Sequence, residues 1–192
     1  ARVAADRPDG VDAGRVAVAP DDGAPIAGLV LANEVVDALP THRVVVRDGE
    51  LREIRVGVGE RDALVDVETE PSTPAIAERL AADAISLEEG QRAEVCLELD
   101  RWVAAAAAGL SRGVLLVIDY GHPAHALYDP SRRAAGTLAT YRSHTVGEDP
   151  YEAIGRQDLT AHVDLTALAA AAAAAGLEPL GEATQMDFLA RL

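Results

Sequence analysis

Two short apolar runs dominate the hydrophobic pattern of the chain. Residues 28–32 (GLVLA) and 114–118 (VLLVI) are continuous, rich in branched side chains and free of polar alternation. Such runs are typical of strands buried on both faces of a parallel sheet. Each run stops at a polar pair, Asn33-Glu34 after the first and Asp119-Tyr120 after the second. Ligands of open α/β sheets bind outside the carboxyl ends of the strands, so these pairs mark a predicted crevice.

The residues after the first run allow two interpretations. Asp37 follows Glu34 by three positions, so a helical turn over residues 35–39 would place both carboxylates on one face. In the first interpretation Asn33 is a helix N-cap and the acids favour the helix dipole. In the second, Glu34 and Asp37 look into the crevice and hold a ligand.

Between the two runs, the pattern predicts a small antiparallel meander over residues 42–69. Residues 43–47 are β-rich, Asp48-Gly49 is a strong hairpin turn, and residues 51–58 roughly alternate apolar and charged side chains. Residues 63–67 complete the meander as a third strand, and residues 15–19 form a separate strand candidate. We expect the meander to be an insertion in an otherwise βαβ chain.

The remaining elements are predicted from helical spacing and caps. Asp164 is an N-cap for a helix over residues 165–175, and Gly176 ends this helix at its C′ position. Cys96 lies on the apolar face of another predicted helix, where we expect it to be a small buried hydrophobic side chain. The other predictions are helices over residues 71–85, 91–110 and 185–192, and a last strand over residues 177–183.

Residues 121–160 form a long segment with polar aromatic side chains and histidines, which we predict to be a substrate lid over the strand ends. Its glycines provide places to bend. We expect four side chains nearest the crevice: Tyr120, His122, Tyr141 and His144. In the alternative interpretation these side chains only pack and cap. The whole pattern predicts one α/β domain with a doubly wound sheet.

Composition narrows the classes of function. The chain has 192 residues and a formal net charge of −15, which argues against a nucleic-acid surface and favours basic protein partners. All 17 basic residues are arginine, so Schiff-base and P-loop lysine chemistry are excluded. The lysine-free, alanine-rich composition suggests a GC-rich bacterial gene. A single cysteine fits a reducing cytoplasm, and the apolar runs fall short of the ~20 residues that span a bilayer.

Common catalytic motifs are missing from the sequence. There is no GxSxG, GxGxxG or GxxxxGK[ST] pattern, and the histidines and acids near residues 144–164 lack convincing metal-ligand spacing. We therefore predict no metal site. Residue patterns alone lead to an acidic α/β domain with a crevice and a lid.

Four longer blocks carry a family resemblance. They are ANEVVDALP at 32–40, LLVIDYGH at 115–122, YDPSRRAAGTLATYRSH at 128–144 and IGRQDLTAHVDLTAL at 154–168, followed by TQMDFL at 184–189. In this order they resemble the signature blocks of the MidA family of S-adenosylmethionine-dependent methyltransferases. The mitochondrial members of that family look like assembly factors of respiratory complex I.

The resemblance implies a Rossmann-like class I methyltransferase sheet, S-adenosyl-L-methionine as cofactor and arginine methylation of a protein. It implies a protein substrate, with a respiratory complex subunit as one candidate, and a mitochondrial matrix location for eukaryotic relatives. The family's glycine-rich cofactor loop has no counterpart here. We therefore expect this chain to match the carboxyl-terminal part of the enzyme and to be inactive alone.

The resemblance also suggests roles for the crevice residues. Glu34, with Asp37, is in a position similar to the acid that grips the guanidinium in arginine methyltransferases. His144 is a candidate proton acceptor, and Asn33 is assigned to cofactor binding. The candidate substrate-binding residues are Asp119, Tyr120, His122 and Tyr141.

Two other functions stay open at this stage. The acidic surface would equally suit a non-catalytic assembly module that holds a basic protein partner. Many class I methyltransferases modify small molecules, so a small-molecule substrate is the third possibility.

Overall fold

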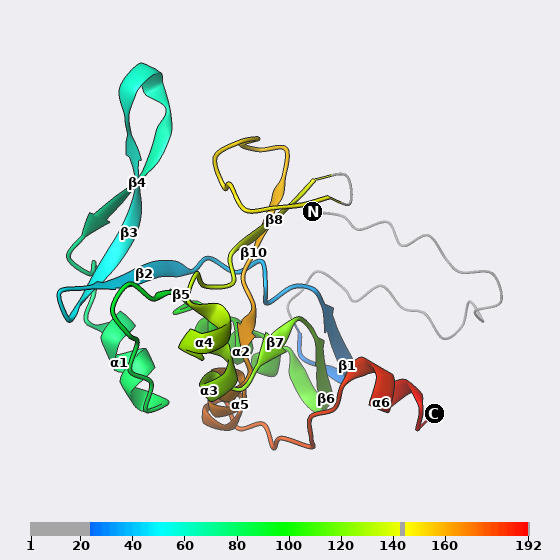
Figure 1. The fold of residues 1–192 in the computed structure, drawn as a ribbon. Helices are drawn as coiled ribbons and strands as arrows, with labels where there is room; N and C mark the ends of the chain where they lie inside the picture. Colours follow the sequence, from blue (N-terminus) through cyan, green and yellow to red (C-terminus); the bar gives the residue numbers. More distant parts are fainter. Residues whose placement is uncertain (1–23, 143–144, 192) are drawn as a thin grey trace.

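The computed structural model describes residues 24–142 and 145–191. Two parallel strands carry the predicted crevice: β1 (Ile26–Asn33) and β6 (Leu110–Ile118). They pair in register up to Asn33↔Ile118, so both end at the same edge. Helices α2 (Leu99–Ala108) and α5 (Leu165–Ala174) pack in a common core near them (Figure 1). The predicted parallel pairing is confirmed.

The prediction that β1 is buried on both faces is wrong. Ala32 on one face is 4% exposed, whereas Leu29 and Leu31 on the other face are 55% and 57% exposed. Successive side chains of a strand point to opposite faces, so one face of β1 packs on the core and the other faces outward. Among the described residues, β1 has one strand neighbour, β6.

An antiparallel sheet of four strands lies between β1 and β6 in the sequence, in the order β4-β3-β2-β5. Its strands are β2 (His42–Arg47), β3 (Glu50–Val58), β4 (Leu64–Thr69) and β5 (Arg92–Val95). Asp48 and Gly49 join β2 to β3 with φ values of 53° and 77°, as a tight hairpin turn requires. Helix α1 (Ala75–Ala82) packs on one face through the fully buried Ile76. The predicted hairpin and its third strand are confirmed.

The β3–β4 ribbon projects beyond the rest of the sheet (Figure 1). A short 3₁₀ turn, η1 (Glu60–Asp62), forms its tip. Val56 and Val58 are 60% and 70% exposed on this ribbon. A side chain at Gly57 would collide with Val67, whose methyl lies 2.4 Å from the position of a Cβ. The absence of a side chain at Gly57 therefore leaves room for the Val67 side chain on the narrow ribbon.

The segment predicted as a lid contains regular structure. A three-stranded antiparallel sheet has β8 (Ala139–Arg142) between β10 (Asp158–Thr160) and β9 (Thr145–Gly147). The short strand β7 (Gly121–His122) pairs with β11 (Val163–Asp164). The remaining helices are α3 (Ala124–Leu127), α4 (Pro130–Arg133) and α6 (Gln185–Leu189). No helix among the described residues is long and apolar enough to cross a membrane.

Several predicted boundaries need correction. The helix predicted over 91–110 is strand β5 followed by α2, because Ala93 and Val95 alternate into the core while Arg92 and Glu94 face the other way. Cys96 consequently lies between the two elements rather than on a helix. Helix α1 is shorter than the predicted 71–85, residues 177–183 form no strand, and residues 35–39 form turns instead of a helix. The strand candidate at 15–19 lies outside the described residues.

The helix caps were predicted correctly. The Asp164 carboxylate accepts hydrogen bonds from the backbone N–H groups of Thr166 and Ala167, both at 3.0 Å, which is the N-cap geometry of α5. Gly176 has φ 81° just after this helix, as a C′ residue requires.

We call the four-stranded sheet β4-β3-β2-β5 the inserted sheet. Its residue Glu53 allows a test of how the stability of the protein depends on pH. Burial raises its pKa, but hydrogen bonds from His42 (2.8 Å) and Ser72 (2.5 Å) outweigh burial and bring the pKa to about 2, from 4.5. A carboxylate with a lowered folded-state pKa stabilises the fold above its unfolded pKa. We expect stability to fall as pH decreases from about 4.5 towards 2, and Glu53→Gln to be less sensitive over this range. Urea unfolding at pH 6 and pH 3 measures the difference, and equal pH dependence in both proteins would contradict it.

Candidate active site at the strand ends

The carboxylate of Asp119 joins the ends of the two parallel strands. Its Oδ2 accepts hydrogen bonds from the backbone N–H groups of Val35, Val36 and Asp37, at 3.2, 2.9 and 3.3 Å. Its Oδ1 accepts from the N–H of Tyr120 at 2.9 Å. Both oxygens therefore bind backbone, which makes Asp119 a residue that shapes the crevice. Its predicted role in substrate binding stays a prediction.

Glu34 occupies an unusual backbone conformation at the end of β1. Its φ is 49°, in the left-handed region that costs energy for a residue with a Cβ. Its N–H continues the sheet by donating to the carbonyl of Ile118 at 2.9 Å, and its side chain is exposed. Strained backbone of this kind often marks a functional position. The conformation turns the chain so that an exposed carboxylate follows the strand directly.

Tyr120 lies near the Glu34 carboxylate, and Tyr141 lies near Tyr120. The charge of Glu34 is the largest cause that raises the pKa of Tyr120, followed by burial and by a hydrogen bond with Glu34. Tyr141 and Asp37 contribute to the same shift. Tyr120 is 57% exposed and Tyr141 40% exposed, so both rings are available to a ligand. The structure thus brings these predicted residues into one group.

Asp37 differs from Glu34 because it is buried, at 6% exposure. Burial raises its pKa, and the charges of Asp119 and Glu34 raise it further. Its Oδ1 has no hydrogen-bond partner among the described residues. The predicted helical turn does not form, so helix capping cannot explain these acids. Asp37 is thus a buried carboxylate, whereas Glu34 is an exposed one.

His122 points towards a second group of side chains. Its Nε2 lies 2.6 Å from a guanidinium nitrogen of Arg133, and its ring centroid is 5.4 Å from that of His162. Burial, followed by the Arg133 charge, lowers the pKa of His122. This arrangement orients His122 towards Arg133 rather than the Glu34 carboxylate. His144 lies outside the described residues, so its predicted catalytic role stays a prediction.

The chain that leads into β11 supports both strand ends. The N–H of Ala161 donates to the carbonyl of Asp37 at 3.0 Å, and the N–H of Val163 donates to the carbonyl of Tyr120 at 2.8 Å. His162 lies between them, and burial lowers its pKa. Sequence reasoning assigned no role at the strand ends to His162 or Arg133, although both lie in the blocks that carry the family resemblance. A nearby basic residue or backbone partner cannot be read from local spacing.

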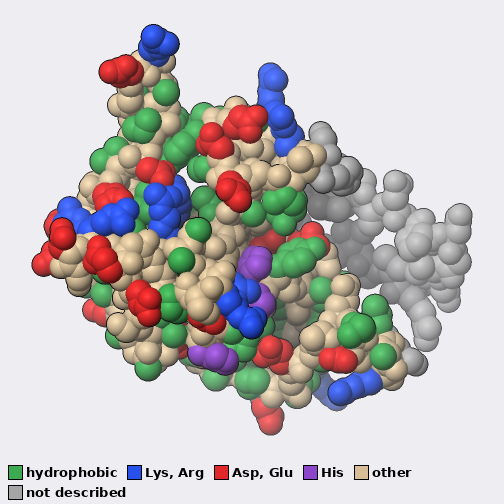
Figure 2. Space-filling view, viewed as in Figure 1, with side chains coloured by type: hydrophobic (Ala, Val, Ile, Leu, Met, Phe, Trp, Pro, Cys, Tyr) green, Lys and Arg blue, Asp and Glu red, His purple; other side chains and the backbone are tan. Residues whose placement is uncertain are grey.

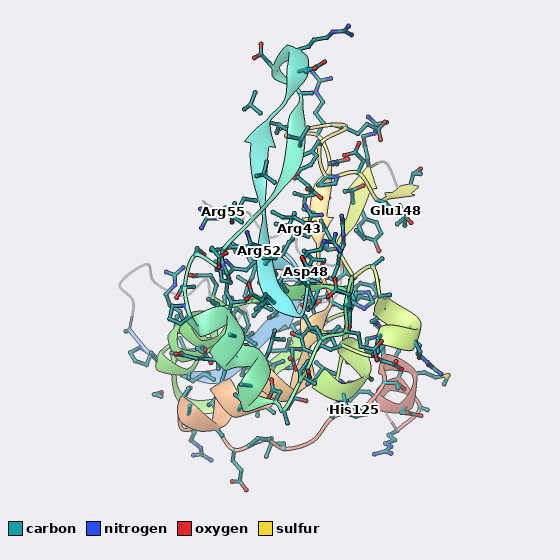
Figure 3. The ribbon with its side chains drawn as sticks, turned by 60° about the vertical axis from the view of Figure 1, so that its left-hand side comes forward. Arg43, Asp48, Arg52, Arg55, His125 and Glu148 are labelled. Atoms are coloured by element: carbon teal, nitrogen blue, oxygen red, sulfur yellow. The ribbon has the colours of Figure 1, made fainter. Side chains whose placement is uncertain are left out.

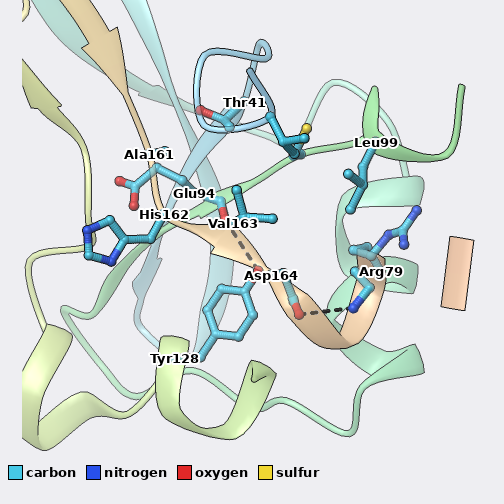
Figure 4. Close-up of a pocket in the computed structure, with 12 residues that line it drawn as sticks. Thr41, Arg79, Glu94, Leu99, Tyr128, Ala161, His162, Val163 and Asp164 are labelled. Atoms are coloured by element: carbon cyan, nitrogen blue, oxygen red, sulfur yellow. Dashed lines mark hydrogen bonds between the residues drawn. The ribbon is translucent and has the colours of Figure 1, made fainter. Parts of the chain in front are cut away.

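A small cavity lies beneath this region (Figure 4). Its volume is about 20 Å³, and its lining includes Glu94, Tyr128, His162 and Asp164. Burial raises the pKa of Glu94 and that of Asp164. The cavity has room for about one water molecule and is too small for an organic cofactor. Within residues 24–142 and 145–191, no three side chains of metal-binding type lie together.

The fold and these strand ends define an α/β protein with acidic side chains at the carboxyl edge of a parallel strand pair. Residues 15–183 match the family model described as a putative S-adenosyl-L-methionine-dependent methyltransferase. The chain belongs to this family. The named relatives and solved structures below support the assignment.

The chain is 31% identical over 144 residues to the Drosophila melanogaster protein named "Protein arginine methyltransferase NDUFAF7 homolog, mitochondrial". That match covers 71% of this chain and 30% of the relative. A likely methyltransferase from Burkholderia thailandensis, crystallised with S-adenosyl-homocysteine, is 33% identical with a TM-score of 0.78. The alignment covers 88% of this chain and 45% of that structure. A native crystal structure of an uncharacterized COG1565 superfamily protein from the same organism has the same TM-score of 0.78.

The chain therefore spans less than half the length of these relatives. The described residues by themselves do not enclose a cofactor of the size of S-adenosylmethionine. Asn33, the predicted cofactor contact, is exposed at the end of β1, and the cavity below holds about 20 Å³. Its predicted role remains untested by these contacts.

Asp119 provides the test of the crevice. Asp119→Ala removes the acceptor of four backbone N–H groups, so we expect a loss of about 1–3 kcal/mol in unfolding free energy. The amides of residues 35–37 should also exchange hydrogen faster. Urea unfolding and hydrogen exchange measure both effects. The control is Asp100→Ala, which removes a half-exposed ion pair with Arg79 and should cost less than about 1 kcal/mol. Equal effects of both variants would contradict the role of Asp119.

Proposed function

We propose that this chain forms the substrate-facing side of an S-adenosylmethionine-dependent methyltransferase that modifies an arginine of a protein. The observation that carries the proposal is the exposed Glu34 carboxylate, presented by a left-handed residue at the end of β1. Family membership and the name of the Drosophila relative support the reaction and the substrate class. The proposal includes a partial Rossmann-like sheet, to which β1 and β6 would belong.

Glu34 suits a guanidinium in charge and geometry. A carboxylate accepts the planar guanidinium fork through two charge-assisted hydrogen bonds. The nearby Asp37 and Asp119 add negative potential, which favours a cation at this edge. The exposed ring of Tyr120, beside Glu34, can pack against the flat face of the guanidinium. These groups would bind and orient the acceptor nitrogen.

The cofactor would supply an activated methyl group. Positioning of the acceptor provides much of the catalysis in such a transfer, because the reacting atoms must be aligned at short range. This chain would orient the guanidinium and surround it with acidic side chains that balance its positive charge. We further propose that residues 121–160 cover the acceptor as a lid, with Tyr141 placed near Tyr120.

Glu34→Gln tests the proposal in the protein at its full length. The substitution keeps the shape of the side chain and removes its charge, so we expect methyl transfer to fall about a hundredfold, the effect of losing one partner of a close charge pair. Incubation of labelled S-adenosylmethionine with a cell-extract protein fraction, followed by analysis for methylarginine, measures the transfer. Calorimetry should show unchanged donor binding.

The matched control is Glu178→Gln, an exposed glutamate after α5 and away from the strand ends. It should transfer methyl groups at the normal rate. Normal transfer by the Glu34 variant would refute the role of Glu34. If the wild-type protein binds the methyl donor but produces no methylarginine, the proposed substrate class is refuted.

A further inference from the structure

The loop between β9 and β10, residues 148–157, is tied to the inserted sheet by one tyrosine. The hydroxyl of Tyr151 donates to Oδ1 of Asp66 on β4 at 2.7 Å. Arg43 on β2 donates to both oxygens of the same carboxylate, at 2.7 and 3.1 Å, and lies 3.4 Å from the Tyr151 hydroxyl. Figure 3 labels Arg43 beside the lower part of the projecting ribbon.

Glu94, on β5 of the same sheet, holds the chain at Thr137, where the segment that leads to this loop begins. Its Oε2 accepts from the N–H of Thr137 at 2.6 Å and from its hydroxyl at 3.0 Å. Gly136, with φ 82°, lies so close that a Cβ would be 2.5 Å from Oε1 of Glu94. Thr137 in turn accepts from the N–H of His162 at 3.1 Å. Glu94 therefore fixes the chain just before β8.

The two attachments differ in their exposure to water. The Glu94 side chain is buried, at 8% exposure for the residue, whereas the Asp66 side chain is 28% exposed. Loss of a buried charged partner is far more disruptive than loss of a partly solvated one. The Glu94 attachment is therefore the permanent one, and the Asp66 attachment can open without unfolding of the sheet.

Both attachments act on the chain that supports the crevice. The segment between Thr137 and Tyr151 carries Tyr141, and β10 beyond the loop leads directly to Ala161 and Val163. Those two residues bond the carbonyls of Asp37 and Tyr120. The position of the 148–157 loop on the inserted sheet is thus connected to the strand ends by a short path of backbone.

We propose that Asp66 and Tyr151 are positioning residues, which hold the 148–157 loop against the inserted sheet and so position β10 and the strand ends that it supports, with Glu94 as the fixed anchor before β8. This inference rests on the proposed function for the identity of the acceptor. The inserted sheet is then the support of this loop. Figure 2 shows acidic and basic side chains interspersed over that sheet, in keeping with the Arg43–Asp66 pair and its neighbours.

Tyr151→Phe is the cleanest test, because it removes one hydroxyl and leaves the Arg43–Asp66 pair in place. We expect hydrogen exchange of the loop amides to become about tenfold faster, the size of one lost hydrogen bond to a charged group. Exchange in β1 and β6 should stay unchanged. Asp66→Asn should act in the same direction.

Glu68→Gln is the matched control, since Glu68 lies two residues along β4 and accepts from Arg47 in the same bidentate way, and among the described residues it makes no hydrogen bond or ion pair with the loop. It should leave loop exchange unchanged. Unchanged loop exchange in Tyr151→Phe, or equal acceleration in Glu68→Gln, would overturn the proposal.

A second readout separates positioning from mere stability. In the methyl-transfer assay, Tyr151→Phe should slow transfer at low acceptor protein concentration and approach the normal rate at saturation. An equal loss at every concentration would contradict a positioning role. If the unmodified protein transfers no methyl group, the proposed function fails, and hydrogen exchange still decides whether Tyr151 holds the loop.

Discussion

The hydrogen bonds from three consecutive backbone amides to the Asp119 carboxylate are the constraint on which the crevice depends. They join the end of β6 to the turn after β1, across more than eighty positions of sequence. Without an acceptor, these amides would face the crevice unpaired, and the left-handed Glu34 would lose the turn that follows it. A charged side chain thus holds the backbone in place, and the carboxylate of the neighbouring Glu34 stays exposed.

The inserted sheet has a comparable role for the segment above the crevice. Its inner face packs on α1, while its outer face carries the carboxylates of Asp66 and Glu94. The Glu94 carboxylate accepts from the N–H of Thr137 before β8, and the Asp66 carboxylate accepts from the Tyr151 hydroxyl in the 148–157 loop. The net charge of −15 is not all available to a partner, because several acids bind backbone or arginine groups of the same chain.

Much of the local structure could be predicted from the sequence, since it depends on neighbouring residues. The two apolar runs, the Asp48-Gly49 turn and the Asp164 cap each carry their signal within a few positions. The errors in the predicted elements have long-range causes. Residues 92–95 form a strand because β2 offers a partner edge, which local spacing does not reveal. The contact of Asp119 with residues 35–37 likewise leaves no trace in local spacing. The grouping of Glu34 with Tyr120 was predictable from strand ends, whereas the turn of His122 towards Arg133 was not.

The central claim is that Asp119 shapes the crevice while Glu34 meets the acceptor. A crystal structure of the protein at its full length, with S-adenosyl-homocysteine and an arginine peptide, tests it most directly. The account predicts a guanidinium within hydrogen-bond distance of the Glu34 carboxylate, with Asp119 still bound to the amides of residues 35–37. A guanidinium paired with another carboxylate, or an Asp119 released from these amides to bind the ligand, would contradict it.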